Sequence, residues 1–210
     1  MAKEAVSFFW FRRDLRLEDN VGLFQALQSK YPVIPLFIFD ETILERLPKN
    51  DPRVGFIHES LAVIDAKLQE FGSSLLVIKG KPLQVWESLL QEYAIQEVFW
   101  NKDYEPNAIQ RDLAVDNLLV SKEVTVLAFK DQVIFEKKEV LTNSSTVFSV
   151  FTPYKNAWLA KLRSVDIEEA KVQRNAFLPA TELKGLTQAF SLAELGFKKT
   201  DLWLKAGETA

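Results

Sequence analysis

Three apolar runs of the sequence end in charged, amide or aromatic side chains. Phe39 closes the second run, Asp103 and Glu105 follow the fourth, and Arg53 stands at the start of a helical pattern. A bound planar heterocycle with N–H and C=O edges needs an aromatic face together with hydrogen-bond acceptors and donors. These four side chains are of those types. The pattern therefore favours a site that holds such a ring without reacting with it.

Motifs for covalent, metal or dinucleotide chemistry are missing from the sequence. It has no cysteine and a single histidine, His58, which excludes disulfides, thiolate catalysis and the usual zinc sites. The first apolar run ends at Phe11 in arginines and acids, and the first glycine is Gly22, so no Gly-x-Gly-x-x-Gly turn follows it. No phosphate loop is present either. We therefore expect His58 to be a surface or partly packed residue, and we expect no metal site.

The elements that must position the polar side chains show as alternating patterns. Nearly continuous apolar runs, typical of strands covered on both faces, occupy residues 6–11, 33–39, 75–78, 98–100 and 124–129. Helical patterns lie between them. This alternation predicts an α/β fold with a doubly wound (Rossmann-like), five-stranded parallel sheet and helices on both faces. In the usual order the first and fourth strands are neighbours, so their carboxyl ends flank one crevice.

The expected helices carry start and stop signals. Asn20 can cap the first helix, and a long helix begins at Arg53 and ends at Gly72. Pro82 suits a first helical turn, and Asn107 opens a further helix.

Beyond residue 130 the pattern loosens. Residues 131–147 are polar and irregular, 151–162 return to a helix, and 164–199 resemble a long connection. We expect this connection to pack on the domain surface through apolar side chains of Phe177, Leu178, Leu183 and Leu192.

Composition limits the partners of the chain. The formal net charge is −3, so the basic excess of a free-standing nucleic-acid-binding protein is missing. No apolar run of eighteen residues and no signal-peptide pattern is present. We therefore expect a cytoplasmic location and no contact with a membrane.

Residues 9–20, Phe-Trp-Phe-Arg-Arg-Asp-Leu-Arg-Leu-Glu-Asp-Asn, resemble the opening signature of the DNA photolyase/cryptochrome family. Weaker matches follow at 100–106, at Arg111-Asp112, and at Phe-Thr-Pro-Tyr-Lys 151–155 through Trp158. In that family the flavin and the repair chemistry belong to a large helical second half, and this chain ends before it. The last residues, Gly-Glu-Thr-Ala 207–210, look like the threshold of that half.

The resemblance implies four parts of the chain. Residues 1–130 would be the core of the photolyase α/β domain and 131–163 its end. Residues 164–199 would be an interdomain linker, and 200–210 the start of the missing helical FAD-binding domain.

The resemblance also implies a second, light-harvesting chromophore on this α/β domain. Asn107 matches the asparagine of the folate type, but Ala108 replaces its glutamate, which counts against methenyltetrahydrofolate. The flavin or deazaflavin type is favoured because Phe39-Asp40, Arg53-Val54 and Asp103-x-Glu105 look like positions of its pocket. The expected cofactor-binding residues are Phe39, Asp40, Arg53, Asn101, Asp103 and Glu105.

Two of these assignments have simpler structural alternatives. Asp103 and Glu105 could be solvated loop acids, favourable near the start of the following helix. The arginines and the acid of the opening signature are expected to form an ion-pair network that fastens the first turn, namely Arg12, Arg13, Asp14 and Arg16.

The function that follows from the resemblance is light harvesting within a deoxyribodipyrimidine photolyase-like flavoprotein. The parent, a carbon–carbon lyase, would repair pyrimidine dimers in DNA with near-UV or blue light. Its own C-terminal helical domain would bind FAD, and damaged DNA would be a partner of the whole protein. The isolated chain is expected to be inactive. The alternatives are a cryptochrome-type blue-light photoreceptor and a pigment-free nucleotide-binding α/β module.

Overall fold

Five parallel strands form a single sheet in the order β3-β2-β1-β4-β5 in this computed structural model, which describes residues 3–171, 176–183, 190–201 and 204–207. The strands are β1 (Ala5–Phe11), β2 (Val33–Asp40), β3 (Leu76–Gly80), β4 (Ala94–Asn101) and β5 (Thr125–Phe129). The predicted doubly wound α/β fold is confirmed, and β1 and β4 are neighbours as expected.

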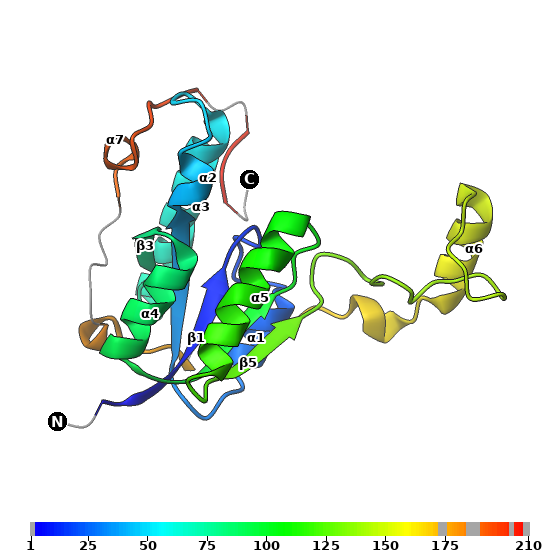
Figure 1. Cartoon of the computed structure of the whole chain (residues 1–210), viewed down its shortest axis with the longest axis horizontal. Coiled ribbons are helices and arrows are strands. Elements are labelled where there is room, and N and C mark those ends of the chain that lie inside the picture. Colours follow the sequence, from blue (N-terminus) through cyan, green and yellow to red (C-terminus); the bar gives the residue numbers. More distant parts are fainter. Residues whose placement is uncertain (1–2, 172–175, 184–189, 202–203, 208–210) are drawn as a thin grey trace.

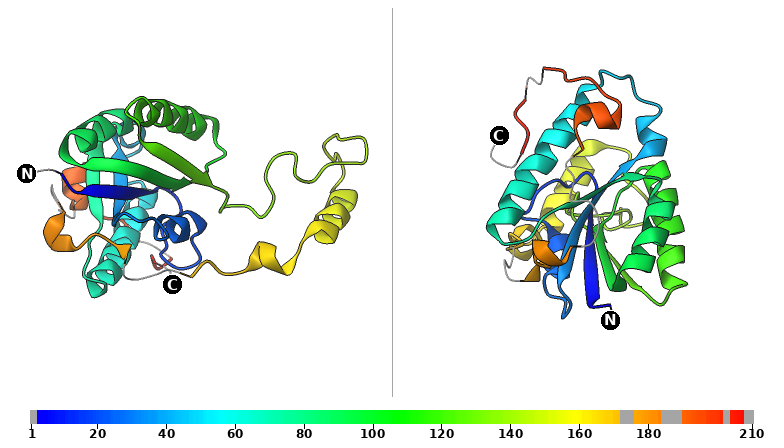
Figure 2. Two further views of the ribbon diagram at one scale, coloured as in Figure 1. Left: turned by 90° about the horizontal axis from the view of Figure 1, so that it is seen from below. Right: turned by 90° about the vertical axis from the view of Figure 1, so that its left-hand side faces the viewer.

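Helices cover both faces of the sheet (Figures 1 and 2). One layer contains α1 (Val21–Ala26) and α3 (Pro52–Glu70), and the opposite layer contains α4 (Pro82–Glu92) and α5 (Pro106–Val120). Each layer has its own apolar cluster because successive strand residues point to opposite faces. Phe9 and Phe11 lie in the α1/α3 cluster, whereas Phe8 and Trp10 lie in the α4/α5 cluster.

The expected helix signals hold, with small shifts. Asn20 caps α1 by accepting from the backbone N–H of Leu23, and Pro82 lies in the first turn of α4. Asp51 caps α3, and α5 starts at Pro106. A short helix that the sequence did not predict, α2 (Glu41–Leu44), follows β2 directly. None of the helices in the described ranges is long and apolar enough to cross a membrane.

β4 begins at Ala94, earlier than the apolar run at 98–100 suggested. The strand contains a bulge: Val6 of β1 pairs with Ile95, and Ser7 pairs with Glu97, so Gln96 falls between two paired positions. Because Gln96 and Glu97 are polar, the first half of β4 does not show as a continuous apolar run in the sequence.

After β5 the chain leaves the sheet as an arm that ends in α6 (Phe151–Lys161) (Figures 1 and 2). No residue of α6 is buried, although Trp158 contacts Phe135 edge to face at 5.4 Å. The predicted helix is therefore present, but its apolar side has no apolar layer to cover it. The irregular segment 131–147 is present as expected.

The returning connection packs on the domain as expected. Phe177 and Leu178 are buried, and Leu178 donates its backbone N–H to the carbonyl of Val33 at 2.9 Å. Leu183 and Leu192 are partly buried against the two clusters. The short helix α7 (Leu192–Leu195) covers the end of α3. Residues 208–210 of the expected family signature lie outside the described residues.

Asn101, the last residue of β4, ties that strand to the turn after β1. Its Oδ1 accepts from the backbone N–H of Gly22 at 2.9 Å, and its Nδ2 donates to Asp14 at 2.6 Å and to Asn20 at 2.8 Å. We call Asn101, Asp14, Asn20 and Gly22 the Asn101 hub. Asn101 and Asn20 are both buried, so each amide depends on these partners.

Arg12 fastens the end of β1 to α5. It donates to Asp112 at 2.6 Å, and its guanidinium packs against the rings of Trp10 and Trp100, 5.2 and 5.7 Å from their centroids. Its side chain is only 6% exposed, and burial lowers the pKa of Arg12 despite the neighbouring carboxylate of Asp112. Arg16 pairs with Asp131 at 2.9 Å. Arg12, Arg13 and Arg16 of the expected network form ion pairs, whereas Asp14 accepts hydrogen bonds from the backbone of Arg12 and from Asn101.

Replacing Gly22 by valine is expected to lower the free energy of unfolding by about 2–3 kcal/mol. A Cβ at this position would lie 2.5 Å from Oδ1 of Asn101, so the hub must shift and lose hydrogen bonds. Urea unfolding followed by circular dichroism measures the loss. Gly72→Asn is the control, because a Cβ there meets nothing within 4 Å and asparagine tolerates its positive φ of 75°. Equal losses in the two variants would contradict the close-packing argument.

Arg12→Ala is expected to lower the free energy of unfolding by about 3–5 kcal/mol, because it removes a buried charge that Asp112 and two indole rings surround. Arg13→Ala is the matched control. The Arg13 side chain is 57% exposed, so its ion pairs are expected to contribute less than about 1 kcal/mol. Denaturant titration of both variants checks the difference. Wild-type stability in Arg12→Ala, combined with loss of a bound chromophore, would instead make Arg12 a ligand contact.

Candidate functional site

The candidate site lies at the carboxyl edge of the sheet. Because β2 and β4 pair with β1 from opposite sides, their carboxyl ends flank the end of β1. Neighbouring strands are about 4.8 Å apart, so the ends of β2 and β4 are separated by roughly 10 Å. This distance suits a flat ring system lying across the end of β1. The strand order also reverses between β1 and β4, which is where open α/β sheets usually bind ligands.

On the β4 side the structure brings Asp103 and Glu105 together around Arg13. Nη1 of Arg13 lies 2.6 Å from Glu105 and 3.8 Å from Asp103. The hydrogen bond to Glu105 raises the pKa of Arg13, so the guanidinium stays charged. The side chain of Asp103 is 9% exposed, whereas that of Glu105 is 65% exposed. The carboxylate of Asp103 is therefore a shielded hydrogen-bond acceptor, and it lies beneath the exposed Arg13–Glu105 ion pair.

On the β2 side the expected residues Phe39 and Asp40 already contact other residues of the protein. The ring of Phe39 is buried and packs edge to face on Phe37 at 4.9 Å. Asp40 caps α2 by accepting from the backbone and hydroxyl of Thr42 at 2.9 and 2.7 Å. Phe39 thus supports the edge from below, and its face is covered by protein in this structure.

Arg53 lies at the start of α3 and points into solvent, with 72% of its side chain exposed. It pairs with the capping residue Asp51 at 2.6 Å, and this hydrogen bond lowers the pKa of Asp51 and raises that of Arg53. Within the described ranges no hydrogen bond or ion pair joins Arg53 to Asp103 or Glu105. The β2 and β4 groups therefore share an edge of the sheet but not a direct contact.

Asn101 belongs to the hub, where both amide hydrogens and the carbonyl oxygen already have protein partners. It positions the residues that follow it, and no amide hydrogen is left to offer a ligand.

A small cavity of about 90 Å³ opens at the ends of β1 and β4. It is lined by two residues of the hub, by the signature arginines and by neighbouring polar residues, namely Arg12, Arg13, Asp14, Arg16, Asn101, Lys102, Asp103, Asp131 and Gln132. Ligand pockets usually measure roughly 300–1,000 Å³. A tricyclic ring would therefore enter this edge only if the exposed Arg13–Glu105 pair opened.

Sequence reasoning missed Asp131, which accepts from Arg16 and from the backbone N–H of Val21 at the start of α1. Its position directly after the last apolar run was the available signal. Asp112 was noted only as part of a family match, and its pairing with Arg12 across 100 positions has no local signal. In the described part of the chain no group of three or more His, Cys, Asp or Glu residues could hold a metal ion.

Comparison with curated proteins identifies photolyases and a cryptochrome among the relatives of this chain. A deoxyribodipyrimidine photo-lyase of Synechococcus sp. is 30% identical over 96% of this chain and 43% of its own length. A 31.6 kDa uncharacterized protein of another Synechococcus strain is 32% identical over 96% of this chain and 70% of its own length. Cryptochrome-1 of Aedes aegypti is 29% identical over 67% of this chain and 27% of its own length. The chain thus spans less than half of the photolyase and cryptochrome relatives.

Solved structures agree with the fold. A photolyase of Sulfolobus tokodaii, solved with two FAD molecules and described as implying a novel light-harvesting cofactor, superposes with a TM-score of 0.70 at 26% identity. The match covers 96% of this chain and 44% of that one. A cryptochrome of Synechocystis sp. gives a TM-score of 0.83 over all of this chain and 45% of its own, with a sequence identity of 19% that supports the fold alone.

The family model described as DNA photolyase matches residues 7–174, which include the whole sheet from the middle of β1 and both helical layers. This match covers far more than half of the sequence, and it includes the hub, the Arg12 contacts and the Asp103–Glu105 edge. The chain therefore belongs to the DNA photolyase family and forms its N-terminal α/β domain.

Proposed function

We propose that this chain holds a light-harvesting chromophore for a deoxyribodipyrimidine photolyase. The observation that carries the proposal is the family match over a domain whose carboxyl edge offers acceptors and donors at the strand reversal. Passing on excitation needs a rigid pocket and no acid, base or nucleophile. The buried hub provides a rigid floor, and the structure of the relative from Sulfolobus tokodaii, which contains two FAD molecules, is described as implying a novel light-harvesting cofactor.

The proposed chromophore is flavin-like. Asp103 would accept from a ring N–H or a ribityl hydroxyl, Glu105 would do the same at the rim, and Arg53 would donate to a ring carbonyl or phosphate. Asp40, Phe39 and Asn101 would support this edge from the protein side. Opening the exposed Arg13–Glu105 pair would cost less than about 1 kcal/mol, so the ring can enter without unfolding the edge.

A folate is the less favoured chromophore. Ala108 is buried in the first turn of α5, where the folate-binding relatives of the sequence resemblance would place a glutamate. An alanine there offers no acceptor to a pterin, and Asn107 is exposed beside it. Methenyltetrahydrofolate remains the alternative that the titration below tests.

The helical FAD-binding domain of the parent is the proposed partner of the arm. Large apolar side chains before, within and after α6 are 51–76% exposed, namely Val147, Val150, Phe151, Leu159, Val165 and Ile167. Such surfaces usually mark an interface. We assign residues 1–130 to the α/β core, 131–163 to its end, 164–199 to the linker and 200–210 to the start of the helical domain.

The whole protein would use FAD and near-UV or blue light to repair pyrimidine dimers, with DNA bound mainly by the helical domain because this chain has a net charge of −3. A cryptochrome-type photoreceptor is the second candidate, because a cryptochrome relative matches two thirds of this chain. The cytoplasmic location stays a prediction.

The protein is expected to bind a flavin or deazaflavin more tightly than methenyltetrahydrofolate. A buried polar group of the ligand that loses its hydrogen-bond partner costs about 1–3 kcal/mol of binding free energy. Asp103→Ala should therefore weaken flavin binding roughly tenfold to hundredfold. Glu105→Ala should weaken it less because its side chain is more exposed. Absorption-monitored titrations of the three ligands measure these affinities.

Glu87→Gln is the matched control for this titration, because Glu87 is an exposed carboxylate on α4 and away from the carboxyl edge. Tighter folate binding that is unaffected by Asp103→Ala and Glu105→Ala would overturn the assignment. No absorption band with any of the three would instead favour the pigment-free alternative.

A second prediction separates repair from signalling. The protein extended by a helical FAD-binding domain is expected to reverse cyclobutane dimers in an oligonucleotide under blue light, whereas residues 1–210 with free FAD should show no reversal. High-performance liquid chromatography of the repaired strand measures the yield. Light-driven flavin reduction without dimer reversal in the extended protein would support the cryptochrome alternative. Repair by residues 1–210 alone would contradict the proposal that repair requires the helical FAD-binding domain.

A further inference from the structure

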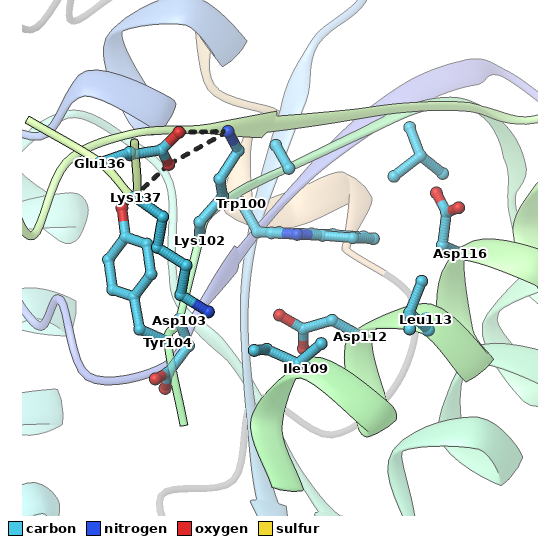
Figure 3. Close-up of a pocket in the computed structure, with 12 residues that line it drawn as sticks. Trp100, Lys102, Asp103, Tyr104, Ile109, Asp112, Leu113, Asp116, Glu136 and Lys137 are labelled. Atoms are coloured by element: carbon cyan, nitrogen blue, oxygen red, sulfur yellow. Dashed lines mark hydrogen bonds and ion pairs between the residues drawn. The ribbon is translucent and has the colours of Figure 1, made fainter. Parts of the chain in front are cut away.

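A second, larger cavity lies between α5 and the β5 edge of the sheet. It measures about 410 Å³, within the usual range of small-molecule pockets of roughly 300–1,000 Å³. Figure 3 shows the indole of Trp100 nearly edge-on, with Ile109 and Leu113 of α5 on one side of it. Val126 and Ala128 of β5 complete an apolar lining. We call this space the Trp100 cavity.

The charged groups that line the Trp100 cavity are mostly acidic. They comprise four carboxylates and two ammonium groups, namely Asp103, Asp112, Asp116, Glu136, Lys102 and Lys137. An excess of one sign of charge around a cavity favours a ligand of the opposite sign. How strongly it does so here depends on which carboxylates the cations of the protein already neutralise.

Three of the four carboxylates already pair with cations of the protein. They are Asp112 with Arg12 at 2.6 Å and Arg111 at 2.8 Å, Glu136 with Lys102 at 3.1 Å, and Asp103 with Arg13 at 3.8 Å. The hydroxyl of Tyr104 also donates to Glu136 at 2.9 Å. The charge of these groups is therefore largely balanced within the protein, and they form fixed walls of the cavity.

The carboxylate of Asp116 differs from the other three. In the part of the chain that the structure describes, no hydrogen bond or ion pair joins it to another residue. Asp116 lies one turn after Leu113 on α5, and it is half-buried. Figure 3 shows it beyond one end of the Trp100 indole. A half-buried carboxylate has fewer water contacts than an exposed one, so a donor group of a ligand would satisfy it well.

Lys137 lies far from Asp116 along the cavity. Figure 3 shows Lys137 together with Glu136 at the end of the cavity opposite Asp116. Lys137 is exposed, and its flexible four-carbon stem lets the ammonium group stay in water. The cavity therefore combines apolar walls with one uncompensated carboxylate at one end.

We propose that the Trp100 cavity binds a small aromatic cation of one or two rings that carries a planar, amidinium-like group. The ring would lie among Trp100, Ile109 and Leu113, and the cationic group would donate to Asp116. An amidinium presents two N–H donors side by side, which match the two oxygens of a carboxylate. The cavity shares Asp103 with the carboxyl-edge site, but Asp116 and the apolar walls are separate from that site, so the inference does not rest on the proposed function.

Three ligands of nearly equal shape and different charge test the proposal. Benzamidine is cationic, benzamide is neutral and benzoate is anionic at neutral pH. The full chain is titrated with each, and the shifts of its backbone amide NMR signals report affinity and location. Ligands of this size bind at millimolar concentration, so the titrations extend to about 10 mM. Benzamidine is expected to bind about tenfold more tightly than benzamide, and benzoate more weakly still, with shifts concentrated on α5 and β5.

Nα-acetylarginine amide is a fourth ligand, which distinguishes an aromatic cation from the arginine side chain of a protein partner. Its guanidinium can bind a carboxylate in the same way, but its aliphatic stem covers less of the apolar lining than a ring does. It is therefore expected to bind more weakly than benzamidine. Equal or tighter binding of Nα-acetylarginine amide would overturn the assignment of an aromatic ligand.

Asp116→Asn is expected to remove the preference for benzamidine over benzamide, because asparagine keeps the shape of the side chain without its charge. Ala128→Trp is expected to weaken benzamidine, benzamide and benzoate alike. Ala128 is exposed on β5, so an indole there can occupy the cavity without disturbing the core. Glu87→Gln, an exposed acid on the neighbouring α4, should leave all affinities unchanged. Thermal melting confirms that the variants fold.

Equal binding of benzamidine and benzamide to the wild-type chain would overturn the proposal. So would an unchanged preference for benzamidine in Asp116→Asn, or unchanged affinities in Ala128→Trp, because the cation would then bind elsewhere. None of these ligands contains a flavin or pterin ring, so the chromophore proposal stands or fails by its own titration.

Discussion

A single buried amide holds the switch point of this sheet together. Asn101 ends β4, yet its side chain satisfies groups from the turn that follows β1 and from the first turn of α1. Buried amides without partners are costly, so the strand and the turn can only be placed together. The requirement extends to Gly22, because a side chain there would occupy the position of the Asn101 oxygen. Glycine serves close packing at this turn, where dinucleotide-binding folds use it to approach a phosphate.

The same strand ends explain how charge is divided at the carboxyl edge. Arg12 is buried against two indole rings and bound to Asp112, whereas Arg13, the next residue, pairs with Glu105 at the surface. Consecutive arginines of one signature thus have different physical roles. The inner one stabilises the contact between β1 and α5, and the outer one forms an exposed ion pair that contributes little stability.

The sheet could be predicted from sequence because parallel strands covered on both faces leave continuous apolar runs. The apolar runs located β1, β2, β3 and β5, although the edge strands β3 and β5 are only partly buried, and β4 was found only in its second half. The partners of Arg12 and Arg16 could not be predicted, since Asp112 and Asp131 lie 100 and 115 positions away and carry no local pattern. Strand order predicted that the ends of β2 and β4 lie on either side of the end of β1, as the structure shows. The burial of the candidate site residues could not be predicted, because whether Phe39 faces a ligand or Phe37 depends on side-chain packing across the layer.

The bulge at Gln96 has a consequence for both faces of the sheet. Residues of β4 before and after it differ in phase, so Ile95, Val98 and Trp100 all reach the α4/α5 layer despite their uneven spacing. In a regularly alternating strand that starts from Ile95, position 100 would face α1 and position 101 would face α5. The indole would then occupy the place of the polar amide, and the amide would lie in the apolar α4/α5 cluster. The extra residue Gln96 therefore decides which face of the sheet each later side chain of β4 occupies. An insertion or deletion in β4 would exchange these faces, so it would disturb the packing more than a single side-chain substitution.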